Sequence, residues 1–517
     1  MNRDKVMPVE QALNMICDGD TVGIGGFVGC MHPEEITLAI EERFLATKTP
    51  RNLTLVYAAG QGDGKDRGIN HFAHEGLVKR VIGGHWALAP KLQKMAIDNQ
   101  IEAYNLPQGA ICHLIRDIAA GKPGTITHVG LRTFVDPEVD GGKLNSRTTE
   151  DIVHRIQIHD RDYLLYDAFP IHVAIVRGSY ADTDGNVSFE REAVNLEMLA
   201  LCQAAKNTGG IVIVQVENVV EKGTLDTRLV KIPGFLVDAI VVARPENHMQ
   251  TFGTQYNPAM SGEIRIPVET LTPLPLDIRK VICRRAAMEL SKGAIVNLGI
   301  GLPDGVAGVV AEEGLNEHIV LTVESGPNGG IPAKGQDFGA AINPDCIIDS
   351  PSQFDFYDGG GIDIAILGIA QMDSHGNINV SKFGSKIAGC GGFINITQNA
   401  KKVVFCGTFT AGGLEVSIKD GKLSIDREGD IHKLLNDVEH ITFNGDYAMN
   451  NGQSVFYVTE RAVFTLTKDG VELIEIAPGM NLSKDILEQM DFKPIVRDVL
   501  KTMDSRIFQD SAMSLKV

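Results

Sequence analysis

Two stretches of this 517-residue chain recur later in the same chain and in the same order, and this internal repeat limits the fold more than any other feature. A shift of 274 residues aligns Gly19, Val22 and Gly25 with Gly293, Val296 and Gly299. The other spacing is 191 residues and lays AIVRGSYADTDGNV, which starts at Ala174, on AILGIAQMDSHGNI, which starts at Ala365. Such a repeat is far longer than a solenoid unit and therefore indicates two copies of one folding unit. The shorter second spacing predicts an insertion in the first copy, part of it in the polar region 120–160.

Apolar segments of strand length alternate with segments of helix length in both copies. Segments such as Ile211–Val216 and Lys402–Cys406 are mostly unbroken apolar runs, which is typical of parallel strands covered on both faces. We therefore expect an α/β protein of two similar, duplicated open domains with mainly parallel sheets. The Pro-rich segment 269–277 predicts the junction, with an N-terminal domain at 1–270 and a C-terminal domain at 277–517.

A carboxylate stands at the end of one predicted strand. Ile319–Val323 is apolar or β-branched, and Glu324 follows it directly. The next six residues, Ser325–Gly330, include three glycines and one proline, so little side-chain bulk surrounds the carboxylate. Ligands of open α/β sheets bind outside the carboxyl ends of the strands, which makes Glu324 a candidate nucleophile or base. A helix cap or a surface ion pair is the ordinary alternative for a glutamate.

The matching strand of the first copy lacks this carboxylate. A spacing of 266 residues lays NLTLVYAAGQGDG, from Asn52, on HIVLTVESGPNGG, from His318, so that Ala58 falls on Glu324. We therefore expect the first copy to keep the fold and to supply a wall of the site.

Two motifs of the chain resemble those of the family I coenzyme A transferases. They are TVESGPNGGIP, around Glu324, and SKFGSKIAGCGGFINIT, at 381–397. The resemblance covers essentially the whole chain and is nearest to the fused-chain branch of propionate and acetate CoA-transferases. The form ESGPNGG, and Met31 at a position where the family pattern has glycine, favour this branch over the 3-oxoacid branch. The resemblance implies a cytoplasmic homo-oligomer, dimer or tetramer, that acts on acyl-CoA and short carboxylic acids.

The resemblance also implies roles for polar groups near the reacting carbonyl. Glu324 would be the catalytic residue, and backbone N–H groups of Gly391 and Gly392 would face the developing oxyanion. Gln108, in the segment PQG, would bind the acyl carboxylate or the oxyanion, although an ordinary loop glutamine explains it equally well.

Two glycine turns that follow predicted strands are candidate CoA-binding loops. They are GIGGFVG, with Gly25 and Gly26, and GIGLP, with Gly299 and Gly301. Neither turn is a full dinucleotide fingerprint or a P-loop, and a tight strand-to-helix turn is as good an explanation of each.

The implied reaction is covalent exchange of thioesters. Glu324 would attack the acyl-CoA carbonyl, and the released CoA thiolate would then form a glutamyl-CoA thioester. Each backbone donor to the oxyanion is typically worth about 3–4 kcal/mol. The alternatives are an acyl-CoA hydrolase, a dinucleotide-binding oxidoreductase and a non-catalytic CoA-binding protein.

Composition excludes several other classes of function. The formal net charge is −18 and no basic face is visible, which argues against a nucleic-acid partner. No run of about eighteen apolar residues predicts a membrane span. The eight cysteines are scattered and form no CxxC, which indicates free thiols in a reducing cytoplasm. The fourteen histidines show no ligand spacing, so we expect no metal and no cofactor apart from CoA as a substrate.

Overall fold

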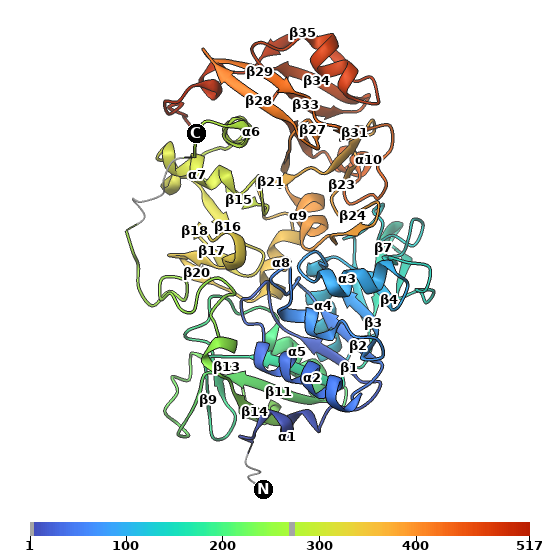
Figure 1. Cartoon of the computed structure of the whole chain (residues 1–517), viewed down its shortest axis with the longest axis vertical. Helices are drawn as coiled ribbons and strands as arrows, with labels where there is room; N and C mark the ends of the chain where they lie inside the picture. The colour runs from blue at the N-terminus through green and yellow to red at the C-terminus, as the bar shows by residue number, and fades with distance from the viewer. Residues whose placement is uncertain (1–4, 268–273) are drawn as a thin grey trace. The chain divides into compact units, whose positions relative to one another are not determined.

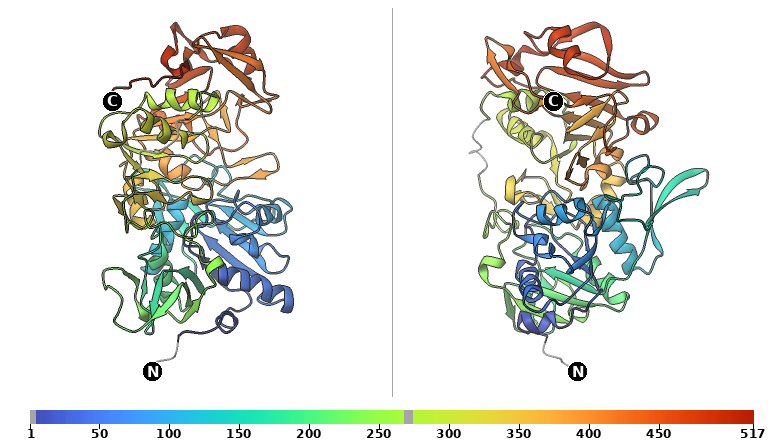
Figure 2. Two further views of the ribbon diagram at one scale, coloured as in Figure 1. Left: turned by 60° about the vertical axis from the view of Figure 1, so that its left-hand side comes forward. Right: turned by 45° about the vertical axis from the view of Figure 1, so that its right-hand side comes forward.

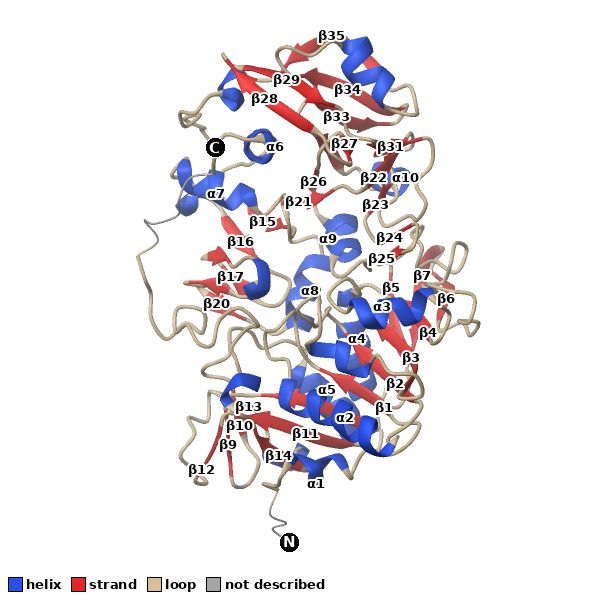
Figure 3. Cartoon of the chain, viewed as in Figure 1, coloured by secondary structure: helices blue, strands red, loops and turns tan. Residues whose placement is uncertain are grey.

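The chain forms two compact units in a computed structural model that describes residues 5–267 and 274–517 (Figures 1 and 3). Unit 1 takes the described residues up to Ile266 together with Val323–Asp355 and Gly384–Asn395, and unit 2 takes the remainder. Glu324 therefore belongs to unit 1, with most of the N-terminal half. The junction expected at 269–277 lies mostly outside the described residues, so the domain limits 1–270 and 277–517 stay a prediction.

A parallel sheet forms the centre of unit 1. Its strands run in the order β14-β11-β8-β1-β2-β3-β4, and each neighbouring pair is parallel. Their bounds are Thr21–Ile24 for β1, Leu53–Tyr57 for β2, Val78–Gly83 for β3, Glu102–Asn105 for β4, Val173–Arg177 for β8, Ile211–Val216 for β11 and Ala239–Val242 for β14. All residues of β1, β2 and β8 are buried, which explains why their sequences are mostly apolar.

Helices cover both faces of this sheet. Ile36 and Phe44 of α2 (Glu34–Thr47) share a core cluster with Val22 and Ile24 of β1, together with α1 (Val9–Leu13) and α3 (Pro90–Ile97). Gly23 points to the opposite face, where a Cβ atom would lie 2.6 Å from Cδ1 of Leu201 in α5 (Met198–Asn207). The absence of a side chain at position 23 thus lets α5 pack closely on β1. Helix α4 (Gln108–Ala119) packs against α5.

Unit 2 repeats this arrangement and then extends it. Its strands run in the order β16-β15-β21-β26-β32-β33-β34-β35, parallel as far as β32, with β33 antiparallel to both of its neighbours. Their bounds are Ile295–Leu298 for β15, Val320–Thr322 for β16, Ile364–Gly368 for β21, Lys402–Cys406 for β26, Ser454–Val458 for β32, Ala462–Thr467 for β33, Gly470–Ile476 for β34 and Ile495–Thr502 for β35. Helices α6 (Ile278–Ala287) and α7 (Gly305–Glu312) pack on β15 and β21 in one core cluster.

The two central sheets agree in strand order and in register, which confirms the duplicated α/β fold. The order β11-β8-β1-β2 of unit 1 corresponds to β26-β21-β15-β16 of unit 2. Paired residues in unit 1 are Thr21 with Thr54, Val22 with Val173 and Val173 with Ile211, and in unit 2 Ile295 with Val320, Val296 with Ile364 and Ile364 with Lys402. Each unit 2 position lies 274, 266 or 191 residues after its counterpart, so the three sequence spacings hold in the paired strands.

The repeated Asp–Gly–Asn motif is a structural turn in both halves. Asp182 accepts hydrogen bonds from the main-chain N–H and the side-chain amide of Asn186, at 2.9 and 2.8 Å. Asp373 makes the same two bonds with Asn377, both at 3.0 Å. Both aspartates therefore stabilise their own loops, and the motif is explained without any chemistry.

The insertion in the first half contains a small antiparallel sheet in addition to β3 and β4. Its strands are β5 (Gly124–Thr127), β6 (Val153–Ile158) and β7 (Arg161–Asp167), in the order β5-β7-β6. The right-hand view of Figure 2 shows the cyan hairpin of β6 and β7 projecting from unit 1. The polar region 120–160 therefore contributes ordered strands to the insertion. In the described part of the chain, no helix combines the length and the apolar character needed to cross a bilayer.

Candidate active site

Glu324 lies in a tight turn directly after β16. The Val323 N–H donates to the Pro327 carbonyl, and the Gly326 N–H donates back to the Val323 carbonyl, both at 3.0 Å. Glu324 itself is partly exposed, whereas the next residue, Ser325, is fully buried. The Ser325 hydroxyl donates to the Gly339 carbonyl at 2.5 Å. The carboxylate is thus carried by a turn whose backbone is fixed on both sides.

The loop after β1 meets the segment that follows Glu324. Phe27 in this loop packs on Phe338, with ring centroids 5.6 Å apart. A Cβ atom on Gly339 would lie 2.4 Å from Cδ1 of Phe27, so glycine is required at that contact. Because Gly339 also binds Ser325, the loop after β1 and the turn of Glu324 are joined through one short stretch of chain.

The loops after β2 and β3 continue this edge of the sheet. The Val28 N–H donates to the Gly60 carbonyl at 2.8 Å, and the Gly62 N–H donates to the Val28 carbonyl at 3.0 Å. A Cβ atom on Gly60 would lie 2.7 Å from Nδ1 of His85, which follows β3. Burial and the nearby charge of Lys386 lower the pKa of His85 to about 4, so its imidazole is neutral at pH 7. Sequence reasoning missed His85, although its place two residues after the apolar end of a strand was a usable signal.

The GCGGF loop lies against the ends of β3 and β4. The Gly391 N–H donates to the Gly84 carbonyl at 2.7 Å, and the Cys390 N–H donates to Oδ1 of Asn105 at 2.9 Å. The Gly391 N–H is therefore already used within the protein. The Gly392 N–H has no hydrogen-bond partner among residues 5–267 and 274–517.

Gln108 is the first residue of α4 and lies beside the same loop. Its main-chain N–H donates to the Gly391 carbonyl at 2.9 Å, and the next N–H, from Gly109, donates to Oδ1 of Asn395 at 3.1 Å. Only 3% of Gln108 is exposed. The described residues offer its side-chain amide no hydrogen bond. Glu324, Gln108, Gly391 and Gly392 thus all belong to unit 1.

The two candidate CoA-binding turns lie in different units. Gly25 and Gly26 belong to unit 1, where a Cβ atom on Gly25 would lie 2.2 Å from Sδ of Met198. Gly299 and Gly301 belong to unit 2, where the Gly299 N–H donates to the Ile366 carbonyl in the middle of β21 at 2.8 Å, as the Gly25 N–H donates to the Ile175 carbonyl in the middle of β8 at 3.2 Å. Both turns therefore follow equivalent strands of the repeated fold, β1 in unit 1 and β15 in unit 2.

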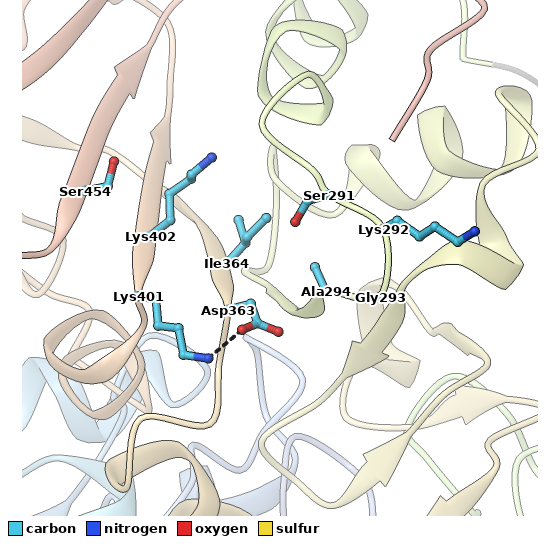
Figure 4. Close-up of a pocket in the computed structure, with 9 residues that line it drawn as sticks. All are labelled: Ser291, Lys292, Gly293, Ala294, Asp363, Ile364, Lys401, Lys402 and Ser454. Atoms are coloured by element: carbon cyan, nitrogen blue, oxygen red, sulfur yellow. Dashed lines mark hydrogen bonds and ion pairs between the residues drawn. The ribbon is translucent and has the colours of Figure 1, made fainter.

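A cavity within unit 2 lies at the opposite, amino ends of its strands (Figure 4). It encloses about 370 Å³ and is lined by Lys292, Lys401, Lys402 and Asp363 among others. Lys401 pairs with Asp363 at 2.8 Å, and Lys402 pairs with Glu289 at 3.0 Å. Because two of its cations are already neutralised, this cavity offers little for an acyl-CoA.

A buried charged network supports the loops at the carboxyl edge of unit 1, and sequence reasoning also missed it. Glu34 accepts hydrogen bonds from His71 at 3.0 Å and from Arg67 at 3.2 Å, and His71 also binds Glu41 at 2.5 Å. Burial acts to lower the pKa of His71, but the two glutamates outweigh it and raise the value to about 9. Burial acts to raise the pKa of Glu34, but His71 and its neighbours lower it to about 2. The pair is therefore ionised at neutral pH.

A second carboxyl group, Glu197, is buried without such compensation. Only 2% of Glu197 is exposed, and the Cys112 thiol donates a hydrogen bond to its carboxyl group, with Sγ 3.8 Å from Oε2. Its Oε1 atom has no hydrogen-bond partner among the residues that the structure describes. Burial raises the pKa of Glu197 to about 7. The folded protein therefore favours the protonated acid.

We expect Glu197→Gln to stabilise the protein at pH 8 and to have little effect near pH 4.5. The folded state keeps the carboxyl proton up to about pH 7, whereas the unfolded chain releases it near the ordinary glutamate pKa of 4.5. Raising the pH through this window therefore lowers the unfolding free energy of the wild type, by up to about 3 kcal/mol. Urea unfolding at pH 4.5, 6 and 8, with the exposed Glu10→Gln as control, measures the effect. A difference between variant and wild type that stays constant with pH would contradict this assignment.

The described residues contain no group of three or more His, Cys, Asp or Glu side chains arranged to hold a metal ion. The chemistry available in unit 1 is therefore that of a carboxylate, glycine-loop N–H groups, a glutamine amide and a neutral imidazole.

Known proteins are similar to this chain in sequence and in fold. The family described as Coenzyme A transferase matches residues 6–243. The chain is 50% identical to caffeate CoA-transferase of Acetobacterium woodii over 98% of both chains. It is 45% identical to acetate CoA-transferase YdiF of Escherichia coli strain K12, over 99% of this chain and 96% of that protein.

Two crystal structures agree with the fold along the whole chain. The apoenzyme of the acyl-CoA transferase YdiF from Escherichia coli O157:H7 matches with a TM-score of 0.96 and 44% identity, covering 100% of this chain and 98% of that one. A thioester complex of YdiF with CoA matches with a TM-score of 0.94 and the same identity and coverage. With about half of its residues identical over nearly its full length, this chain belongs to the coenzyme A transferase family, as a fused-chain member of family I.

Proposed function

We propose that this protein moves CoA between short-chain acyl-CoA thioesters and free acids such as acetate, propionate and lactate, through a glutamyl-CoA thioester on Glu324. The observation that carries the proposal is the turn Val323–Pro327, which holds Glu324 partly exposed beside a fully buried Ser325. A carboxylate on a fixed turn is suited to nucleophilic attack because little reorganisation precedes the reaction. The thioester complex known for YdiF supports the same intermediate.

The proposed exchange ends with as many thioester bonds as it began with, and passes through an anhydride between them. A Glu324 oxygen attacks the acyl carbonyl, the carbon–sulfur bond breaks, and a mixed anhydride forms with release of CoA thiolate. The thiolate then attacks the Glu324 carbonyl carbon, which frees the first acid and leaves CoA on the glutamate. A second acid runs the two steps in reverse. No metal or redox cofactor is required, and CoA is a substrate.

Backbone and side-chain donors of unit 1 would stabilise the oxyanion of each attack. The Gly391 N–H is bound to Gly84, which favours the Gly392 N–H as the donor from the GCGGF loop. The buried amide of Gln108 would bind the acyl carboxylate or the oxyanion. The turns at Gly25–Gly26 and Gly299–Gly301 remain our candidates for contacts to CoA. We further propose a homo-oligomer.

The choice of acid is the finer part of the proposal. Acetate is the acid named for YdiF, and caffeate is the acid named for the Acetobacterium woodii relative, which is slightly more similar in sequence. A bulky aromatic acid is therefore the second candidate substrate, next to the short acids.

We expect acetyl-CoA to exchange with propionate and lactate, and the assay to require both a thioester and an acceptor acid. Incubation with acetyl-CoA and a panel of acids, including caffeate, followed by chromatography of the acyl-CoA products, measures the preference. Rapid CoA release without any acceptor would identify a hydrolase, and product only with caffeate would move the preference to aromatic acids.

A further inference from the structure

The loop after β1 contains backbone strain that its own sequence does not relieve. Val28 and Met31 both have φ of 55°, in the left-handed region that non-glycine residues rarely adopt, and valine is β-branched. Gly26, two residues before Val28, also has a positive φ, of 153°. Strained backbone of this kind persists only where the surrounding structure fixes it, and it concentrates at functional sites. Something outside the loop must therefore hold it.

Gln61, from the loop after β2, provides this hold. Its side chain is fully buried, and its Nε2 donates to the carbonyl of Ile24, the last residue of β1, at 2.9 Å. Its Oε1 lies 2.6 Å from Nδ1 of His32, just beyond the other end of the loop. One glutamine amide thus joins both ends of the Gly25–Met31 loop. We call this pair of side chains the His32–Gln61 clamp.

The hydrogen bonds of Gln61 fix a proton on one ring nitrogen of His32. A carbonyl oxygen can only accept, so the contact with Ile24 places the Gln61 NH₂ there and its oxygen towards His32. Nδ1 of His32 must then carry a proton, and Nε2 lies 3.0 Å from the Thr37 hydroxyl, from which the neutral ring accepts. Burial lowers the pKa of His32 to about 4, even with Glu34 only 3.5 Å from Nε2, so the neutral ring is favoured.

The clamp also explains a glycine of the candidate CoA-binding turn. A Cβ atom on Gly26 would lie 2.5 Å from Oε1 of Gln61, so the amide occupies the space that a side chain would need. The two main-chain bonds between Val28 and the Gly60–Gly62 stretch lie beside this contact. The clamp therefore fixes the path of the Gly25–Met31 loop along the loop after β2.

We propose that His32 and Gln61 are positioning residues for acyl transfer, which lock the strained Gly25–Met31 loop in the conformation that the reacting acyl-CoA requires. Neither side chain is exposed, so both act through the loop rather than on the substrate. The proposal rests on the function proposed above and adds the pair that preorganises its site.

The test compares four variants with the wild type in the acetyl-CoA exchange assay. His32→Leu removes the donor to Gln61, and Gln61→Glu keeps the shape but cannot donate to Ile24. His32→Asn keeps a donor near the position of Nδ1. His440→Leu, the control, removes a buried histidine of unit 2 that binds Ser381 at 2.8 Å.

We expect His32→Leu and Gln61→Glu to lower kcat by about 30- to 100-fold, the effect of a displacement of about 1 Å at a reacting centre. The KM for acetyl-CoA should change less than about threefold, because the clamp orders the loop rather than binding the ligand. His32→Asn should recover most of the lost rate. His440→Leu should lower the unfolding temperature without this loss of kcat.

A wild-type kcat in folded His32→Leu or Gln61→Glu would overturn the proposal. Failure of His32→Asn to recover activity would do so too, as would a loss that follows unfolding temperature equally in all four variants. If both His32→Leu and Gln61→Glu fail to fold, the role is structural and the proposal is wrong. Failure of the proposed function is a separate outcome, because the wild type would then show no exchange at all.

Discussion

Replacing Glu324 by glutamine is expected to abolish CoA exchange, with kcat lower by at least about 10⁴-fold, the scale of losing a covalent nucleophile. A glutamine amide has the size of the carboxylate but cannot form the anhydride or the thioester. The turn around it is made by main-chain bonds of Val323, Gly326 and Pro327, which the substitution leaves in place. CoA binding should therefore survive, and calorimetric titration with CoA measures it beside the exchange rate.

A matched control lies seven residues earlier in the chain. Glu317 is exposed in the short helix Asn316–His318, and Glu317→Gln changes the charge by the same amount. It should keep wild-type exchange. Appreciable exchange in Glu324→Gln, or an equal loss in both variants, would show that the carboxylate at 324 is not the nucleophile.

Gly326→Ala is expected to have the second largest effect, with a loss of stability of about 3 kcal/mol and little remaining exchange. The φ angle of Gly326 is 126°, and a Cβ atom there would lie 2.0 Å from the Ile348 carbonyl oxygen. Main chain cannot move aside as a flexible side chain can, so the turn must open and carry Glu324 with it. Thermal unfolding and the exchange assay measure the two losses.

Gly335→Ala is the control that distinguishes the cost of a positive φ angle from the cost of a steric clash. Gly335 has φ of 61° and lies in the same unit, but a Cβ atom there would meet nothing within 4 Å. This variant should lose only about 1 kcal/mol and keep its activity. Similar losses in both variants would show that the contact with Ile348 does not govern the turn.

The sequence predicts the repeated part of the fold well because each half of the chain can be aligned with the other, so a strand expected in one half is supported by its counterpart. The strands expected at Ile211–Val216 and Lys402–Cys406 have those bounds in the structure. The helical spacing of apolar residues predicts a helix over Pro8–Cys17, but the observed helix is shorter, Val9–Leu13, since the chain turns before Cys17. The lengths of buried strands follow from apolar runs, whereas helix ends depend on contacts that periodicity does not record.

Sequence patterns point to a candidate site residue only where its neighbours in the chain make it recognisable. Glu324 stands out as a carboxylate between a strand and a glycine turn. The occupied N–H of Gly391 could not be predicted, because its acceptor, Gly84, is some three hundred residues away in the chain. His32 and Gln61 were missed for the same reason, since each is an ordinary polar residue until folding brings the loops after β1 and β2 together. The grouping of Val323–Asp355 with unit 1 likewise depends on long-range contacts.

The most direct test of the account is to find where CoA is attached during turnover. The protein is incubated with acetyl-CoA, quenched in acid, digested, and its peptides are weighed before and after hydroxylamine treatment. The account predicts one peptide, containing Glu324, that carries the mass of CoA and loses it to hydroxylamine, and no such adduct in Glu324→Gln. Exchange that proceeds with no adduct, or with CoA attached to another residue, would contradict it.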